Sequence, residues 1–296
     1  MDTRDTTDTG KLIWNTAISA FFIMFFLPSA IAADGAGLRL IDGYLVVTAT
    51  LNESHNGQFL LDTGADATVI SPVVANLLDL EPTTYVEAGV AGGNTIRVPF
   101  TELQSVSIGR HSVPLETVII LDVSELMEEA FADIDGIIGS DFLRHFTSTI
   151  DLVEKRLQFE TPETLAKRLE HGVKIPAEIV DGTAIFLPVR LNGRLNGRYK
   201  LDTGAAVTHL TLADATRLGM TSEAEGVRVD KSEGIGGSYD VLLFDLREFE
   251  VGAASPVEHL PVKAYETAYG FIGADFLQHF NLTLNYADEF IVLSTP

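Results

Sequence analysis

The chain has 296 residues, of which 46% are hydrophobic and 21% are charged. This length leaves room for two domains that each bury a core, and the composition is that of a folded protein, not of a disordered or fibrous one. Acidic residues outnumber basic residues by 42 to 20, and the formal net charge of -22 argues against nucleic acid as a partner because phosphates would repel the chain. The absence of cysteine excludes disulfides, thiolate nucleophiles and zinc–thiolate sites.

An uncharged apolar segment runs from Leu12 to Ala33. It ends in small residues at alternate positions, as a leader-peptidase site does, which predicts a signal peptide over residues 1–32 with cleavage after Ala32. About 20 apolar residues also suffice to cross a bilayer, so an uncleaved membrane anchor is the alternative interpretation. Either interpretation predicts that the rest of the chain is exported from the cytoplasm, as a periplasmic, secreted or anchored protein.

The elements that follow are predicted to be mainly β-strands. Alternating and continuous apolar runs predict strands over 38–51, 58–61, 184–191 and 199–201. Hairpin turns between them are predicted at the pairs Asn56-Gly57, Asn192-Gly193 and Asn196-Gly197. In each half a short helix is expected later, with Asp141 or Asp275 helping to start it.

A connector is predicted between the two halves. Pro162–His171 is typical of a short amphipathic helix, because Leu165 and Leu169 share a face and proline stands in the first turn. We therefore assign residues 33–160 to a first lobe, 161–182 to the connector and 183–296 to a second lobe. The connector has no low-complexity character, which predicts that the lobes pack together.

The most informative feature is an internal repeat. The segment LDTGA at Leu61–Ala65 recurs at Leu201–Ala205, and GIIGSDFLRHF at Gly136–Phe146 recurs as GFIGADFLQHF at Gly270–Phe280. The two motifs come in the same order at nearly the same spacing. The chain is therefore predicted to contain a duplicated domain.

Each repeat places an aspartate at the end of an apolar strand, followed by a small polar residue and a glycine. Such a carboxylate lies on a tight loop at the edge of a core. In this repeated context the sequence resembles the retropepsin-like branch of the aspartic proteases, whose lobes carry Asp-Thr-Gly-Ala early and an apolar-apolar-Gly strand late. The resemblance covers about residues 38–160 and 183–296. It implies a mainly β, two-lobed acid-protease fold.

The resemblance implies that Asp62 and Asp202 form the catalytic dyad of an aspartic endopeptidase. Two carboxylates about 3 Å apart cannot both ionise, so they share one proton and can activate a water molecule against a peptide bond. Neither a metal nor a cofactor is expected, and the expected partner is a polypeptide substrate. The residues that would support the dyad are Thr63, Gly64, Thr203 and Gly204. Because one chain holds both half-sites, a monomer should suffice, with a dimer formed in trans as the alternative.

The resemblance also implies substrate contacts. Gly92 and Gly93 in the first half, and Gly236 and Gly237 in the second, stand where the family has a flap that closes over the peptide. Asp66 matches a residue that binds substrate main chain in retroviral enzymes. The second repeat has Ala206 at that place, so an asymmetric cleft is expected.

Two other functional classes remain open from the sequence. One is an exported peptide-binding or partner-binding protein of the same fold that does not cut. The other is a metal protein, because His145 and His279 follow Asp141 and Asp275 by four positions and would share a helical face with them. The acidic composition itself is interpreted as favouring solubility.

Overall fold

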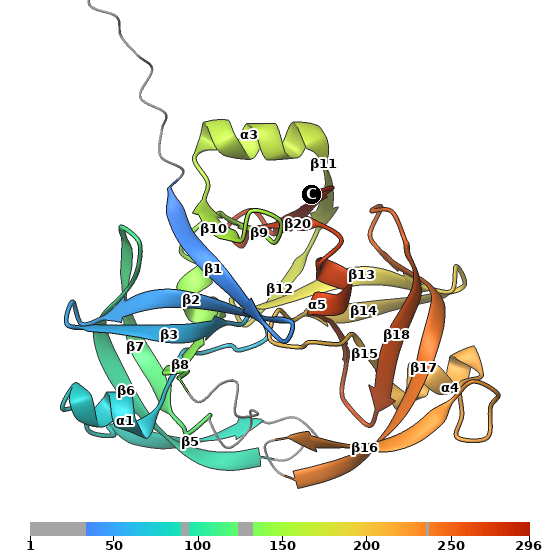
Figure 1. Cartoon of the computed structure of the whole chain (residues 1–296), viewed down its shortest axis with the longest axis horizontal. Helices are drawn as coiled ribbons and strands as arrows, with labels where there is room; N and C mark the ends of the chain where they lie inside the picture. The colour runs from blue at the N-terminus through green and yellow to red at the C-terminus, as the bar shows by residue number, and fades with distance from the viewer. Residues whose placement is uncertain (1–33, 90–94, 124–132, 235–236) are drawn as a thin grey trace, which may run out of the picture. The chain divides into compact units, whose positions relative to one another are not determined.

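Two β-sheets with the same internal strand order build the chain from residue 34 onward (Figure 1). The computed structural model describes residues 34–89, 95–123, 133–234 and 237–296. Residues 33–296 form a single unit, and the leader predicted over residues 1–32 lies outside the described residues. Within the described ranges no helix is both long enough and apolar enough to cross a bilayer.

The first lobe, coloured blue to green in Figure 1, carries the first repeat. Its elements are β1 (Gly35–Ile41), β2 (Tyr44–Leu51), β3 (His55–Leu61), β4 (Val69–Ile70), α1 (Pro72–Leu77), β5 (Thr84–Gly89), β6 (Thr95–Ile108), β7 (His111–Ile120), β8 (Gly136–Ile138), α2 (Ser140–Leu143), β9 (Ser148–Asp151) and β10 (Arg156–Phe159).

The second lobe, coloured yellow to red, follows the helix α3 (Pro162–His171). Its elements are β11 (Gly172–Pro176), β12 (Glu178–Val180), β13 (Ala184–Leu191), β14 (Leu195–Leu201), β15 (His209–Thr211), α4 (Leu212–Leu218), β16 (Arg228–Gly234), β17 (Gly237–Val251), β18 (Val257–Tyr265), β19 (Gly270–Ile272), α5 (Ala274–Leu277), β20 (Asn281–Asn285) and β21 (Phe290–Ser294).

The two lobes have the same topology. The strand order is β1-β2-β3-β8-β4-β7-β6-β5 in the first lobe and β12-β13-β14-β19-β15-β18-β17-β16 in the second. In both, the strand that leads into the Asp-Thr-Gly motif pairs in parallel with the strand of the later glycine motif, β3 with β8 and β14 with β19. The predicted mainly β, two-lobed fold and its internal duplication are therefore confirmed.

A third set of strands joins the lobes. Strands β11, β21, β20, β9, β10 and β1 lie in this order, so each lobe contributes to one continuous sheet. At its centre, between β9 and β20, the buried hydroxyl groups of Thr149 and Thr283 lie 2.7 Å apart. The helix α3 has the bounds predicted from the sequence and begins with a capping box in which Thr161 and Thr164 bond to each other's backbone. Strands β11 and β12 fall within the span assigned to the connector.

Two of the three predicted Asn-Gly turns are wrong. Asn192 and Gly193 do form the turn between β13 and β14, with φ angles of 51° and 66°. Asn56-Gly57 lies inside β3 and Asn196-Gly197 inside β14, one strand residue or more beyond the real turns. The first-lobe turn begins at Asn52, also with positive φ. Gly57 serves close packing instead, because a Cβ there would lie 2.6 Å from a carboxylate oxygen of Asp135.

The short helices after the late glycine motifs begin differently from the prediction. The N-cap of α2 is Gly139, without a side-chain cap, and Asp141 stands in the first turn. One oxygen of Asp141 accepts from the backbone N–H of Thr68, and the other accepts from the Thr68 hydroxyl and the N–H of Phe142, at 2.8 to 2.9 Å. The aspartate therefore ties α2 to the loop that follows the Asp-Thr-Gly motif.

The second lobe repeats this contact in a weaker form. There the same oxygen of Asp275 accepts from the N–H and hydroxyl of Thr208 and from the N–H of Phe276. Within the described part of the chain, the other oxygen of Asp275 is buried without a hydrogen-bond partner. Asp141 and Asp275 occupy equivalent positions in the two repeats, but Asp141 accepts hydrogen bonds at both carboxylate oxygens and Asp275 at one.

This difference predicts losses of unequal size for the same substitution in the two repeats. In Asp141→Asn an amide NH2 must face either the Thr68 N–H or the two donors on the other side, so we expect the free energy of unfolding to fall by about 1–3 kcal/mol. In Asp275→Asn the NH2 can take the unpartnered position, and the loss should stay within about 0.5 kcal/mol. Urea denaturation of both variants checks this. Equal losses in the two variants would show that the number of hydrogen-bonded carboxylate oxygens does not determine the change in the free energy of unfolding.

Candidate active site

The Asp-Thr-Gly loops hold each aspartate in the same way. The backbone N–H of Asp62 donates to Ile138 and that of Asp202 donates to Ile272, both at 3.0 Å, so each loop is fastened to the strand of the late glycine motif. One oxygen of each carboxyl group then accepts the backbone N–H two residues on, at 2.7 Å in the first lobe and 2.9 Å in the second. The carboxyl groups are oriented by their own loops before anything else contacts them.

These two carboxyl groups lie against each other between the lobes. They hydrogen-bond to each other and are each half-buried. A Cβ placed on Gly64 would come within 2.4 Å of the Asp202 carboxyl carbon, and one on Gly204 within 2.3 Å of that of Asp62. Only glycine at these two positions leaves room for the opposite carboxyl group.

Their environment favours a shared proton. Burial raises the pKa of Asp62. Burial, together with the neighbouring charge of Asp62, raises the pKa of Asp202 well above its ordinary value. Because the groups interact this strongly, their titration belongs to the pair and not to either residue alone.

Two buried threonines lock the loops together. The hydroxyl of Thr63 donates to the carbonyl of Leu201 at 3.1 Å and accepts from the N–H of Thr203 at 3.1 Å. In return, the hydroxyl of Thr203 donates to the carbonyl of Leu61 at 2.7 Å and accepts from the N–H of Thr63 at 3.0 Å. All four bonds cross between the lobes, so they fix the separation of the two aspartates.

A buried lysine, which the sequence analysis missed, stands next to this interlock. The ammonium group of Lys200 donates to the carbonyl of Gly64 at 2.8 Å and to Asp66 at 3.1 Å. Its positive charge lowers the pKa of both Asp62 and Asp202, against the larger effect of burial. The signal was visible in the repeat, because Lys200 stands where the first copy has the apolar residue Leu60.

The two Asp-Thr-Gly loops also differ in the hydroxyl groups that lie behind them. Behind the first loop, the Ser140 hydroxyl donates to the carbonyl of Thr63 at 3.0 Å and lies 2.9 Å from the hydroxyl of Tyr286. The second repeat has Ala274 where the first has Ser140, and the first has Leu152 where the second has Tyr286. The hydroxyl contacts are therefore present on one side only.

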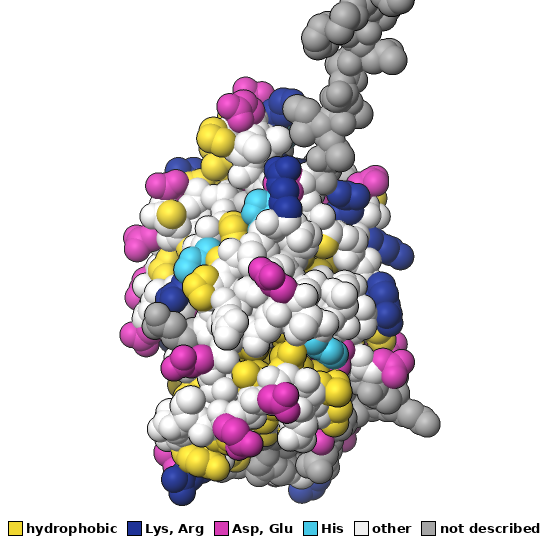
Figure 2. All heavy atoms as spheres, turned by 90° about the vertical axis from the view of Figure 1, so that its left-hand side faces the viewer, with side chains coloured by type: hydrophobic (Ala, Val, Ile, Leu, Met, Phe, Trp, Pro, Cys, Tyr) yellow, Lys and Arg dark blue, Asp and Glu magenta, His cyan; other side chains and the backbone are white. Residues whose placement is uncertain are grey.

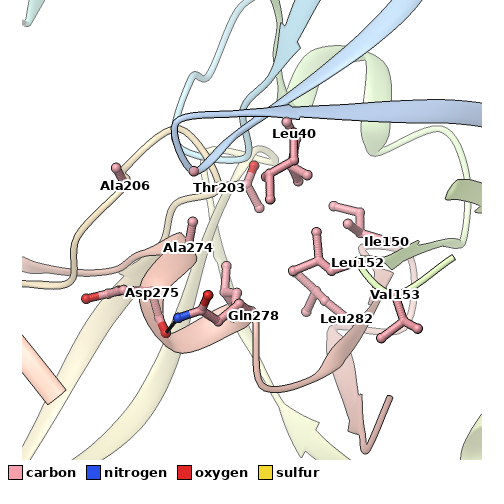
Figure 3. Close-up of a pocket in the computed structure, with 13 residues that line it drawn as sticks. Leu40, Ile150, Leu152, Val153, Thr203, Ala206, Ala274, Asp275, Gln278 and Leu282 are labelled. Carbon is pink, nitrogen blue, oxygen red and sulfur yellow. Dashed lines mark hydrogen bonds between the residues drawn. The ribbon is translucent and has the colours of Figure 1, made fainter. Parts of the chain in front are cut away.

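A cavity of about 370 Å³ occupies the less filled side (Figure 3). Its lining is mostly apolar and includes Leu40, Ile150, Leu152, Thr203, Ala274 and Leu282. In Figure 3, α5 lies on one side of the cavity, and Ile150 of β9 with Leu152 and Val153 just beyond it lies on the other. Neither Asp62 nor Asp202 lines this cavity, so it is separate from the paired carboxyl groups.

The structure describes only some of the residues predicted to bind substrate. Asp66 is exposed, and besides Lys200 it accepts a hydrogen bond from the Thr183 hydroxyl of the second lobe at 3.3 Å. Gly237 begins β17 and pairs with Gly234 at the end of the hairpin formed by β16 and β17. The remaining predicted flap residues, Gly92, Gly93 and Gly236, lie outside the described residues.

The carboxylates considered for metal binding have other partners. Asp141 and Asp275 are bonded to Thr68 and Thr208, while His145 and His279 are exposed beyond the ends of α2 and α5. In the part of the chain that the structure covers, no three histidine, aspartate or glutamate residues form a group that could hold a metal ion. On the face shown in Figure 2, acidic and basic side chains are scattered among polar and hydrophobic ones.

Comparison with models of protein families shows the class of protein to which the chain belongs. A family model described as aspartyl protease matches residues 47–142 and, a second time, residues 187–276. These matches cover more than half of the chain and fall one in each lobe, so the chain belongs to the aspartyl protease family. A comparison with curated proteins found no similar sequence.

The threonine interlock predicts a large loss of stability when either hydroxyl group is removed. Thr63→Val leaves the Thr203 N–H and the Leu201 carbonyl buried without their partner, at a cost of about 1–3 kcal/mol for each group. Thr203→Val leaves the Thr63 N–H and the Leu61 carbonyl without theirs, so it should behave alike, and the double variant, which loses all four bonds, should lose about the sum. Denaturant unfolding of the parent and the three variants measures this, with Thr63→Ser, which keeps the hydroxyl, as control. Small losses in the single variants would contradict the interlock.

Proposed function

We propose that the chain is an aspartic endopeptidase in which Asp62 and Asp202 are the catalytic pair. The observation that carries the proposal is the contact between the two carboxyl groups, held by hydrogen bonds from both loops and by the threonines between them. Membership of the aspartyl protease family, whose members act on polypeptides, agrees with this chemistry.

The proposed reaction needs only these two groups and water. The pair holds one proton, so one carboxylate takes a proton from a water molecule that attacks the scissile carbonyl carbon. The protonated partner donates to the developing oxyanion and stabilises it. Proton transfer to the departing nitrogen then completes cleavage of the C–N bond. Because the pair must hold one proton, we expect activity at acidic to mildly acidic pH.

Three further parts of the proposal concern where and how the protein works. The apolar segment Leu12–Ala33 supports export from the cytoplasm, with the protein either released or held at a membrane by that segment. Both aspartates come from one chain and meet within one unit, which supports activity as a monomer. Asp66 and the hairpin formed by β16 and β17 are proposed to contact the substrate main chain.

Loss of either carboxylate should abolish cleavage. We expect the protein of residues 33–296 to cut a diverse peptide library between pH 3 and 8, and Asp62→Asn and Asp202→Asn each to lower the rate by about 100-fold or more, because the general base and acid act as one unit. Mass spectrometry of the products measures this. Circular dichroism of the variants controls for folding, since asparagine retains an acceptor for the loop N–H.

Three results are distinguishable. Cleavage that persists in both variants would contradict the proposed pair. A folded parent that binds peptides but yields no fragments at any pH would identify a binding protein of the same fold. Activity that chelators remove while Asp62→Asn leaves it intact would indicate metal chemistry.

Lys200 should set the pH range of activity. Its charge lowers the pKa of both aspartates, so Lys200→Met raises both apparent pKa values of the pair. The acidic limb of the profile of kcat/KM then moves to higher pH, because the first proton leaves later. The alkaline limb moves in the same direction, because the second proton is also held longer.

Two matched variants control this measurement. Lys200→Arg keeps the charge and should leave the limbs closer to those of the parent. Lys174→Met removes a lysine of β11 whose ammonium group lies over the ring of Phe290, 4.0 Å from its centre, and should leave both limbs in place. A shift of the Lys200→Met limbs to lower pH would contradict the assigned role.

A further inference from the structure

Helix α3 stands over the sheet that joins the lobes without burying any of its own residues (Figure 1). A surface helix normally packs an apolar stripe against its neighbours, but here even Leu169 is 38% exposed. Apolar packing therefore contributes little to the position of this helix. The side of α3 that faces the sheet is polar and cationic, and its residues have the spacing of one helical face: Thr164, Lys167, Arg168 and His171.

The face of the sheet below α3 is also polar. Gln158 of β10 pairs with Thr149 of β9, and Thr149 pairs with Thr283 of β20, so these three side chains point to the same face. Asn281 lies two residues before Thr283 on the same strand and shares that face. This is the face toward the helix, because Arg168 donates to the side-chain oxygen of Gln158 at 2.7 Å.

A cavity of about 350 Å³ lies between the helix and this face of the sheet. Its volume is in the range of sites that bind small ligands. The cavity is separate from the paired carboxyl groups, because neither Asp62 nor Asp202 lines it.

The lining of this cavity carries a surplus of positive charge, although the net charge of the chain is -22. Glu160, with only 1% of its side chain exposed, is neutralised by Arg168, whose Nε donates to it at 3.1 Å. No described residue forms a hydrogen bond or an ion pair with the ammonium group of Lys167. His171 adds a further charge when it is protonated, and its Nδ1 lies 2.8 Å from the carbonyl of Lys167, which leaves Nε2 for another contact. The cavity therefore favours an anion.

The side-chain amide of Asn281 lines this cavity without a protein partner. The residue is only 7% exposed, and no described residue donates to its Oδ1 atom. A buried polar group that lacks a hydrogen bond destabilises the folded protein, so this amide is suited to something other than stability. Its oxygen can accept an N–H while its NH2 group donates to a carbonyl, and a peptide group offers both.

We propose that the cavity beneath α3 is a second binding site, which takes the carboxyl-terminal end of a short peptide. The terminal carboxylate pairs with the ammonium group of Lys167, and the last peptide group bonds to the amide of Asn281. Hydrolysis of a peptide bond creates a new carboxyl terminus, so the products of the proposed protease reaction carry this chemistry. The binding itself does not require the catalytic pair, so it can be tested apart from cleavage.

The test compares matched probes by isothermal titration calorimetry on the protein of residues 33–296, which forms a single unit. The probe is acetyl-alanyl-alanine, which has a free carboxylate and two peptide groups. Its carboxyl-terminal amide lacks the charge, and acetate lacks the peptide groups. We expect the probe to bind about 10-fold or more tightly than either control, because each control loses one of the two contacts. Asp62→Asn, which prevents turnover, should bind the probe with the affinity of the parent.

Substitutions in the cavity should weaken binding without unfolding the protein. Lys167→Met and Asn281→Leu should each lower the affinity for the probe by about 10-fold. Asn281→Leu also removes an unpartnered buried amide, so its midpoint of denaturant unfolding should equal or exceed that of the parent, which a purely structural role of Asn281 would not produce. Lys231→Met removes the same charge from an exposed residue of β16 and is the control, with unchanged affinity.

Each outcome either supports the site or overturns it. If the affinity survives both Lys167→Met and Asn281→Leu, or is lost in Asp62→Asn, the peptide binds elsewhere and the inference is wrong. No binding of the probe to the folded parent at millimolar concentration would mean that the cavity holds only water, as polar cavities do. A parent that binds the probe through Lys167 and Asn281 but cleaves no peptide at any pH would refute the proposed function and leave this site standing.

Discussion

Two carboxyl groups pressed together in a half-buried position are unstable unless the protein fixes them and lets them share a proton. Removal from water and mutual repulsion both disfavour a second negative charge. Around Asp62 and Asp202 the structure supplies loop N–H donors, two glycines without a side chain and two interlocked threonines. Each lobe supplies half of this arrangement, so neither lobe holds a complete site.

The neighbouring strands and helices hold the two Asp-Thr-Gly loops in place. The loops are fastened to β8 and β19, and these strands lead into α2 and α5, whose aspartates bond back to Thr68 and Thr208. The strands shared between the lobes, with β9 beside β20, join the two halves below the loops. The structure thus uses backbone pairing, buried hydroxyl groups and the ammonium group of Lys200 to hold the lobes in register.

The two repeats differ in the side chains that surround the paired carboxyl groups. Lys200 in place of Leu60 gives the pair a cation on one side, and Tyr286 in place of Leu152 fills one side while the other retains a cavity. The second lobe has the rings of His209 and Phe271 where the first lobe has Val69 and Ile137. A symmetric core therefore carries asymmetric surroundings, which allows the two sides of a substrate to be treated differently.

Most of the fold could be predicted from the sequence because its signals are local and repeated. The motif around Asp62 recurs around Asp202, and the helix of Pro162–His171 has a proline and a capping residue at its start. The turn at Asn52 was missed because no glycine marks it, and its position is set by which residues of β3 face the core. The contacts of Lys200 and the contact between the rings of His209 and Phe271 depend on pairing between distant strands, which no local pattern reveals.

The most direct test of the central claim is a titration of the two carboxyl groups by NMR, with ¹³C at the aspartate side chains and with Asp62→Asn and Asp202→Asn for assignment. We expect the two groups to titrate as a coupled pair in two separated steps, with one proton retained well above the ordinary aspartate pKa of about 3.9 and each substitution changing the titration of the other group. Two independent titrations near that ordinary value would contradict a shared proton and, with it, the proposed catalytic pair.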